Sequence, residues 1–105
     1  MGGRYRLRAV SNPMDTTRTK LDRLTLLIER LQDAELLLDA EGAALLTATQ
    51  AVRQSLEAGD IATARRHIEQ IARFTEALVT TQALGPAEGR AVIETARRIP
   101  ASDAN

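Results

Sequence analysis

The stretches LLDAEGAALL (residues 37–46) and LGPAEGRAVI (residues 84–93) decide the fold, because they repeat one pattern 47 residues apart in a chain of 105. Each contains the triplet Ala-Glu-Gly shortly after a leucine, and small and apolar residues follow within two positions. A carboxylate near a helix N-terminus is stabilised by the helix dipole, so both stretches are typical of a first helical turn. Glycine costs roughly 1 kcal/mol relative to alanine in a helix, and we expect it where another backbone comes close.

Apolar residues recur at helical spacing before and after each of these two stretches. The four stripes are Leu21, Leu24, Leu27, Ile28 and Leu31; Leu45, Ala48, Val52 and Leu56; Ile61, Ala64, Ile68, Ile71, Phe74 or Thr75, and Leu78; and Val92, Ile93, Ala96 and Ile99. Sliding the chain by 47 positions superimposes residues 21–49 on residues 68–96. We therefore predict an all-α fold, an antiparallel four-helix bundle built from two repeated helical hairpins. The alternative is that two unrelated amphipathic hairpins share the same periodicity.

The ends of the four helices carry capping signals. The expected N-caps are Thr16, Thr17 or Thr19 for the first helix, Asp39 for the second and Asp60 for the third. Leu37 and Leu38 should pack over the first joint. Gly59 can take the left-handed conformation that closes a helix, and Gly85–Pro86 should end the third helix and start the fourth. The predicted core is Leu24, Leu31, Leu45, Val52, Ile68, Ile71, Leu78 and Val92.

The joint near Ala34 is the weakest point of this prediction, because residues 31–46 are rich in helix formers and contain no glycine before Gly42. A separate helix starting at Asp39 predicts a closed hairpin. One continuous helix would instead dock on a second copy of the chain and give a swapped dimer.

The N-terminal residues differ in character from the rest of the chain. Residues 1–15 are predicted to be an extended basic arm or linker, residues 16–100 the four-helix domain, and residues 101–105 a disordered tail. RYRLRAV (residues 4–10) alternates as a strand does, so it resembles the last strand of a preceding β-sandwich; a disordered arm is the alternative. An exposed strand of this kind is a second route to a homodimer. The whole chain has 14 basic and 14 acidic residues and thus no overall charge preference.

No residue pattern in the sequence indicates catalysis. Cysteine is absent, which excludes disulfides and thiolate chemistry. The single histidine, His67, is interpreted as a surface or boundary residue, and Glu29 and Glu76 as surface charges rather than an acid/base pair. Ser11, Ser55 and Ser102 have no base in a plausible triad order. We therefore predict a protein that is not an enzyme, with no catalytic, cofactor-binding or metal-binding residues and no membrane span.

Several features are shared with a known family. They are the leucine-rich helix that opens LDRLTLLIERLQDAELLLDAEG (residues 21–42), LEAGD (56–60), Ala64, Ile68, Phe74 and VIETARRI (92–99). Over about residues 20–99 the chain resembles the FIMAH domain, a small helical module of large bacterial extracellular proteins. The resemblance implies a non-enzymatic accessory domain. The chain departs from the family after the first helix, where a glycine is expected and Asp33-Ala34-Glu35 is followed by three leucines.

Two functional hypotheses follow. The first is a non-catalytic interaction or structural accessory module of a larger, secreted bacterial protein, whose partners are other domains of the parent polypeptide, a separate protein or a second copy. Such a module would be extracellular, whereas a free-standing chain would be cytoplasmic. The alternative is a small dimeric nucleic-acid-binding regulator that uses the basic N-terminal strand, as ribbon–helix–helix proteins do. Residues 21–105 are net acidic, which argues against nucleic acid.

Overall fold

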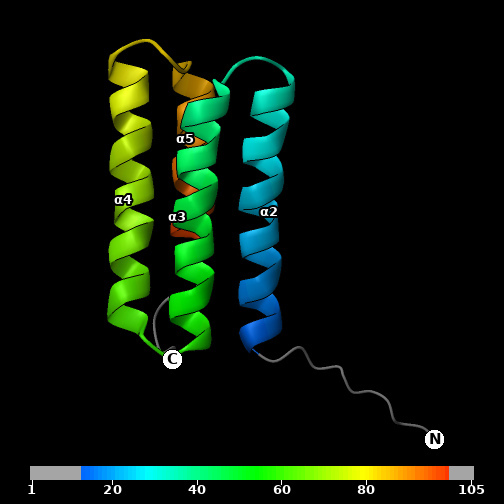
Figure 1. The fold of residues 1–105 in the computed structure, drawn as a ribbon, viewed down its shortest axis with the longest axis vertical. Helices are drawn as coiled ribbons and strands as arrows, with labels where there is room; N and C mark the ends of the chain where they lie inside the picture. The colour runs from blue at the N-terminus through cyan, green and yellow to red at the C-terminus, as the bar shows by residue number, and fades with distance from the viewer. Residues whose placement is uncertain (1–12, 100–105) are drawn as a thin grey trace, which may run out of the picture.

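The computed structural model describes residues 13–99, which form four α-helices joined by short turns and contain no strand. The helices are α2 (Pro13–Asp33), α3 (Asp39–Glu57), α4 (Ile61–Thr80) and α5 (Pro86–Arg97). Figure 1 shows them side by side as a helical bundle, with the chain reversing direction at each turn. The prediction of an all-α fold is confirmed. The predicted strand at residues 4–10 and the tail at 101–105 lie outside the described residues.

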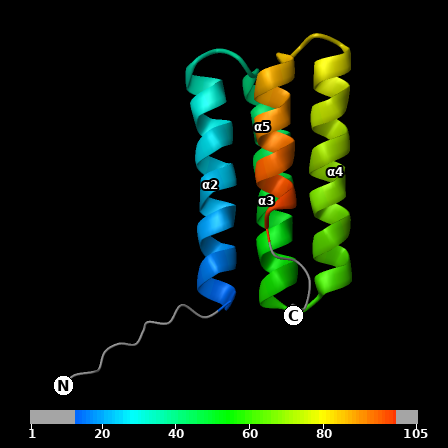
Figure 2. The same cartoon turned by 180° about the vertical axis from the view of Figure 1, so that it is seen from behind.

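The helices pack in a ring. α2 packs on α3, α3 on α4, α4 on α5, and α5 returns to pack on α2. Figures 1 and 2 show α2 and α4 on opposite sides of the bundle, with α3 on one face between them and α5 on the other. The first and last helices are therefore neighbours, and all four apolar stripes face one central core.

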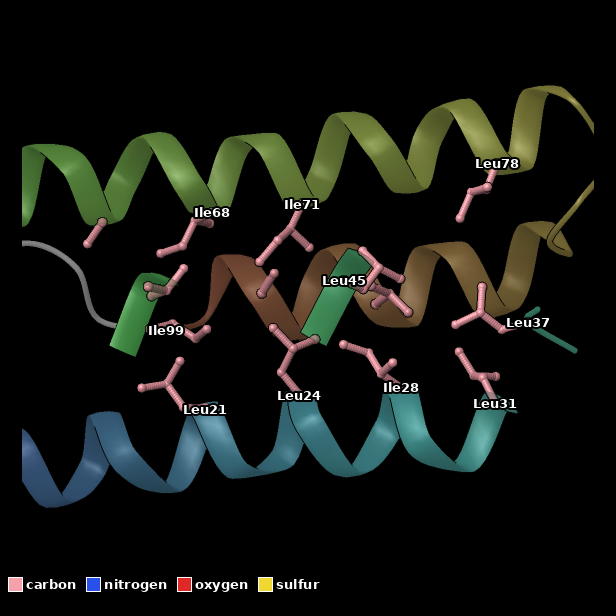
Figure 3. Packing of buried hydrophobic residues seen from close by; sticks show 14 of the residues in the cluster. Leu21, Leu24, Ile28, Leu31, Leu37, Leu45, Ile68, Ile71, Leu78 and Ile99 are labelled. Atoms are coloured by element: carbon pink, nitrogen blue, oxygen red, sulfur yellow. The ribbon is translucent and has the colours of Figure 1, made fainter. Parts of the chain in front are cut away.

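The core is aliphatic, and it contains all eight residues predicted for it. Figure 3 shows leucine and isoleucine side chains from α2, α3 and α4, together with Leu37 of the first turn and Ile99 after α5, meeting along the bundle axis. Two threonines are also fully buried. The Thr49 hydroxyl donates to the carbonyl of Leu45 over 2.8 Å, and the Thr75 hydroxyl donates to that of Ile71 over 2.7 Å. Both hydroxyls are thus satisfied inside their own helices.

One core position was left open between two residues, and one apolar residue does not pack as expected. Of Phe74 and Thr75, Thr75 takes the core position, because it lies four residues after Ile71 on the inward face of α4, whereas Phe74 is 38% exposed. Leu37 is buried at the first joint as predicted, but Leu38 is 68% exposed. The prediction that Leu38 packs over the joint is therefore wrong.

Of the first two helices, α2 begins before its expected capping residues, and α3 begins at its expected N-cap. α2 begins at Pro13, so Thr16, Thr17 and Thr19 lie within the helix, and residues 13–15 of the predicted extended arm are helical. Proline suits a first helical position, where no amide donor is needed. In α3, Asp39 is the first helical residue rather than the N-cap. The cap is Leu38, whose amide donates to Glu41 Oε1 over 3.2 Å, so the glutamate of the repeated triplet does the capping.

The turn between α3 and α4 has the predicted chemistry. Gly59 has a φ of 77°, in the left-handed region. Asp60 is the N-cap of α4, and its Oδ1 accepts a hydrogen bond from the Thr63 amide over 3.1 Å. Hydrogen bonds from the Thr63 hydroxyl and amide lower the pKa of Asp60 from its ordinary value. Pro86 is the first residue of α5, as predicted.

The turn between α2 and α3 closes without glycine. Glu35 takes the left-handed conformation with a φ of 63°, and the Leu36 amide donates to the Leu31 carbonyl over 2.9 Å. The buried Leu37 then covers the end of the core. α2 and α3 are therefore separate helices that pack on each other within one chain, and the alternative of one continuous helix is wrong.

The two helical glycines lie beneath side chains rather than beneath another backbone. Both are buried. A Cβ on Gly42 would occupy the space of the Gln32 side chain, and a Cβ on Gly89 would occupy the space of the Val79 side chain. The expectation of a close backbone is therefore wrong, since a side chain of the preceding helix fills the space that each glycine leaves.

Candidate functional site in a groove between α2 and α5

A groove of about 320 Å³ runs along the seam between the first and last helices. Four of its lining residues are basic: Lys20, Arg23 and Arg30 from α2, and Arg98 just after α5. The other four are apolar or small: Leu26 and Leu27 from α2, and Ala91 and Thr95 from α5. We call this surface the α2–α5 groove.

Helical spacing places these residues on the groove. The α2 residues Lys20, Arg23, Leu27 and Arg30 are spaced by three, four and three residues, so they form a second stripe beside the core stripe of the same helix. In α5 and its C-cap, Ala91, Thr95 and Arg98 each directly precede a buried residue. The groove is thus the outer edge of the interface through which α5 packs on α2.

Charge is divided between the two sides of α2. Asp22, Glu29 and Asp33 are spaced by seven and four residues and follow the side that faces α3, where Asp22 pairs with Arg53 over 3.0 Å. The side that faces α5 carries the cations. No carboxylate among residues 16–99 lines the α2–α5 groove or forms an ion pair with its four basic side chains. The groove is therefore a site of positive potential.

The groove also contains apolar surface. Leu26 is 47% exposed, and Leu27 and Ala91 are partly buried along the floor. Leu26 is one of only four large apolar side chains exposed among the described residues. The site therefore combines apolar area with a single sign of charge, which suits a ligand that is both apolar and anionic.

A second groove lies between α4 and α5 and differs in charge. Its volume is about 620 Å³, and it is lined by acidic residues, Glu76 and Glu94, as well as basic ones, Arg90 and Arg97. Arg97 also pairs with Glu69 over 3.3 Å. Mixed charge gives this groove no preference for an anionic or a cationic ligand.

The residues weighed for chemistry in the sequence are not brought together. Glu29 and Glu76 are exposed on α2 and α4, the two helices that lie across the bundle from each other. His67 is partly buried, and its Nδ1 lies 3.1 Å from Gln70 Oε1. No three His, Cys, Asp or Glu side chains of the described residues could share a metal ion. Ser55 is partly buried on α3. Ser11 and Ser102 lie outside the described residues.

Sequence analysis missed the α2–α5 groove. A detectable signal was present, because Lys20, Arg23 and Arg30 share one helical face with the exposed Leu26 close by. This basic stripe follows the same helical period as the core stripe beside it on α2. The contribution of Arg98 could not be detected in this way, since it depends on α5 packing beside α2.

Comparison with protein-family models, with curated proteins and with solved structures found no match for this chain. Within residues 13–99, no helix has the length and apolar character needed to cross a membrane.

Proposed function

We propose that the chain is a non-catalytic interaction and structural module, an accessory part of a larger, secreted bacterial protein. The observation that carries this proposal is the α2–α5 groove, where an exposed leucine and four cations share one face of a closed aliphatic bundle. Apolar area next to charge of one sign is typical of a surface that binds another protein.

The proposal includes an antiparallel four-helix bundle made of two repeated hairpins. The geometry of the two turns supports it, because corresponding features recur 47 residues apart. Glu35 and Gln82 have φ values of 63° and 64°. The Leu36 amide donates to Leu31 over 2.9 Å, and the Ala83 amide donates to Leu78 over 2.8 Å. The remaining matched pairs are the buried Leu37 and Leu84, and the buried Gly42 and Gly89.

The resemblance of residues 20–99 to the FIMAH domain supports the accessory role. That family implies a helical module attached to a large extracellular protein, with other domains of the same polypeptide, or a separate protein, as partners. An extended arm at residues 1–15 would serve as the link to a preceding domain. The chain would then be extracellular, whereas a free-standing protein of this sequence would be cytoplasmic.

The nucleotide sequence upstream of the Met1 codon tests this proposal. We expect an open reading frame that continues upstream into β-sandwich repeats and begins with a signal peptide. A stop codon followed by a ribosome-binding site directly before Met1 would contradict the accessory role. That result would favour a free-standing protein.

A further inference from the structure

We propose that the α2–α5 groove binds an acidic amphipathic helix of a partner protein. This inference rests on the proposed interaction role and specifies its partner. It commits to one occupant with two properties: carboxylates along its flanks and apolar residues on the face that enters the groove.

Charge complementarity supplies the first property. The rim of the groove on α2 carries three cations, Lys20, Arg23 and Arg30. The opposite rim carries Arg98. No carboxylate among residues 16–99 lines the groove or forms an ion pair with these four cations. Because cations line both rims of the groove, an occupant with carboxylates along both of its edges would pair with them.

The apolar floor supplies the second property. A wholly anionic ligand, such as inorganic phosphate or a nucleic-acid backbone, would be held by the rims but would leave Leu26 and Leu27 without a partner. An occupant with leucine or a similar residue on one face would bury Leu26, which is 47% exposed in the free chain. The floor therefore favours a polypeptide over a purely ionic ligand.

The shape of the groove favours a helix. Lys20 and Arg30 are ten residues apart on one helix, a distance of about 15 Å along its axis. The groove runs between two helices that pack on each other along this length. An amphipathic helix of about three turns matches it, since its apolar face and both acidic edges can then contact the floor and the rims together.

Fluorescence anisotropy with a labelled synthetic peptide tests the proposal on the full 105-residue chain. The probe is a peptide of about 11 residues, about 16 Å as a helix, with leucines at helical spacing on one face and glutamates on both flanks. Three competitors accompany it: a scrambled peptide of identical composition, a version with lysine replacing glutamate, and a random DNA duplex. We expect only the acidic amphipathic peptide to bind, with affinity falling about ten-fold as NaCl rises from about 50 to about 300 mM.

Two variants locate the binding site. The double variant Arg23→Glu/Arg30→Glu replaces exposed cations of the groove by anions, and we expect its Kd to rise at least about ten-fold. Leu26→Ser leaves the charge unchanged and should weaken binding by about three-fold or more. The matched control is Arg66→Glu/Arg73→Glu, which makes the same change of net charge on an exposed face of α4. Circular dichroism verifies that each variant is folded.

Four outcomes overturn the inference. The scrambled peptide could bind as tightly as the acidic amphipathic peptide, or the α4 control could lose as much affinity as the Arg23/Arg30 variant. Binding could also be unchanged in both groove variants, or the DNA duplex could bind more tightly than the peptide. Self-association of the chain that the two groove variants abolish would also overturn it, since the occupant would then be a second copy. None of these results depends on the reading frame upstream of Met1. Failure of this inference and failure of the accessory role are therefore distinguishable.

Discussion

Gly42 and Gly89 occupy equivalent positions in the first turns of α3 and α5, but the side chains that cover them differ in stiffness. Gln32 covers Gly42 with the far end of a flexible side chain, whose amide also donates to the Asp39 carbonyl over 3.4 Å. Val79 covers Gly89 with a methyl group close to its own backbone. A β-branched side chain has few alternative rotamers, so only Gln32 can move aside cheaply.

We therefore predict opposite effects of one substitution at the two positions. Gly89→Ala should lower the free energy of unfolding by about 1–3 kcal/mol, because Val79 or the whole of α4 must shift. Gly42→Ala should be neutral or should stabilise by up to about 1 kcal/mol, because alanine is the better helix former. Urea denaturation monitored by circular dichroism measures both.

The control for this pair is the Val79→Ala background, where the space above position 89 is open. There, the cost of Gly89→Ala should fall well below its cost in the wild-type chain. An equal cost in both backgrounds would show that the glycine is needed for some reason other than the valine above it.

The position of both glycines in the first turn of a helix could be predicted from the sequence, because the Ala-Glu-Gly triplet recurs in the same context. The side chain that covers each glycine could not be predicted. Gln32 and Val79 reach these positions only because α2 crosses α3, and α4 crosses α5, at a particular place. Crossing points are set by packing over the full length of two helices.

At the scale of the helices and turns, the left-handed residues Glu35 and Gln82 carry a strain that glycine would relieve. A side chain in this conformation costs roughly 1 kcal/mol or more, whereas glycine adopts it freely. Part of that gain is lost because glycine also makes the unfolded chain more flexible. Glu35→Gly and Gln82→Gly should each raise the free energy of unfolding by about 0.5 kcal/mol.

The neighbouring residue Ala83 provides the control, because its φ is not positive. Ala83→Gly brings only the added flexibility of the unfolded chain and should lower the midpoint of thermal unfolding. If all three glycine substitutions lower this midpoint, the left-handed turns do not carry the strain assigned to them.

The cap at Asp60 makes the stability of α4 depend on pH. Hydrogen bonds from the Thr63 hydroxyl and amide hold the pKa of the Asp60 carboxyl below its ordinary value. The stabilisation of the fold by this ionised cap is fully present above the pKa that Asp60 has in the unfolded chain. It is lost as the pH falls through the lower pKa that Asp60 has in the folded chain. Between pH 5 and pH 2, we expect Tm to fall less in Asp60→Asn than in the wild type. Thr63→Val removes the hydroxyl but keeps the amide, so its Tm should show intermediate pH dependence.

Helix ends were predictable where the chemistry is local. Gly59 and Asp60 supply a left-handed residue and a capping carboxylate at adjacent positions, and both work as expected. The end of α2 is different, because Glu35 has no intrinsic preference for a left-handed conformation. Burial of Leu37 against the other helices holds this turn closed, and that contact exists only in the folded chain.

At the scale of the whole molecule, one core sustains all four helices. Ile71→Asp would bury an unpaired charge at the centre and should cost more than about 4 kcal/mol, a large part of the stability of a small domain. Loss of helical signal and of the cooperative thermal transition in circular dichroism is the expected result. Phe74→Asp places the same charge one helical turn along α4 on an exposed side chain, and this variant should remain folded. Full helicity in the Ile71 variant would contradict the core assignment.

The core could be predicted from sequence because burial follows the helical period. The α2–α5 groove is a property of the complete bundle. Its rims come from residues almost 70 positions apart, Arg30 and Arg98. They meet only because the last helix closes the ring on the first.

That closure also determines how the molecule would respond to mechanical force. α2 begins, and α5 ends, toward the same end of the bundle (Figure 1), and Leu21 and Ile99 both belong to the core cluster. A pull on the two ends would act across these helices rather than along them. Their contacts would separate one turn after another, as in a zipper, instead of resisting together. Tension on the polypeptide would therefore part α2 from α5 first, so the groove between them would be the first feature of the fold to be lost.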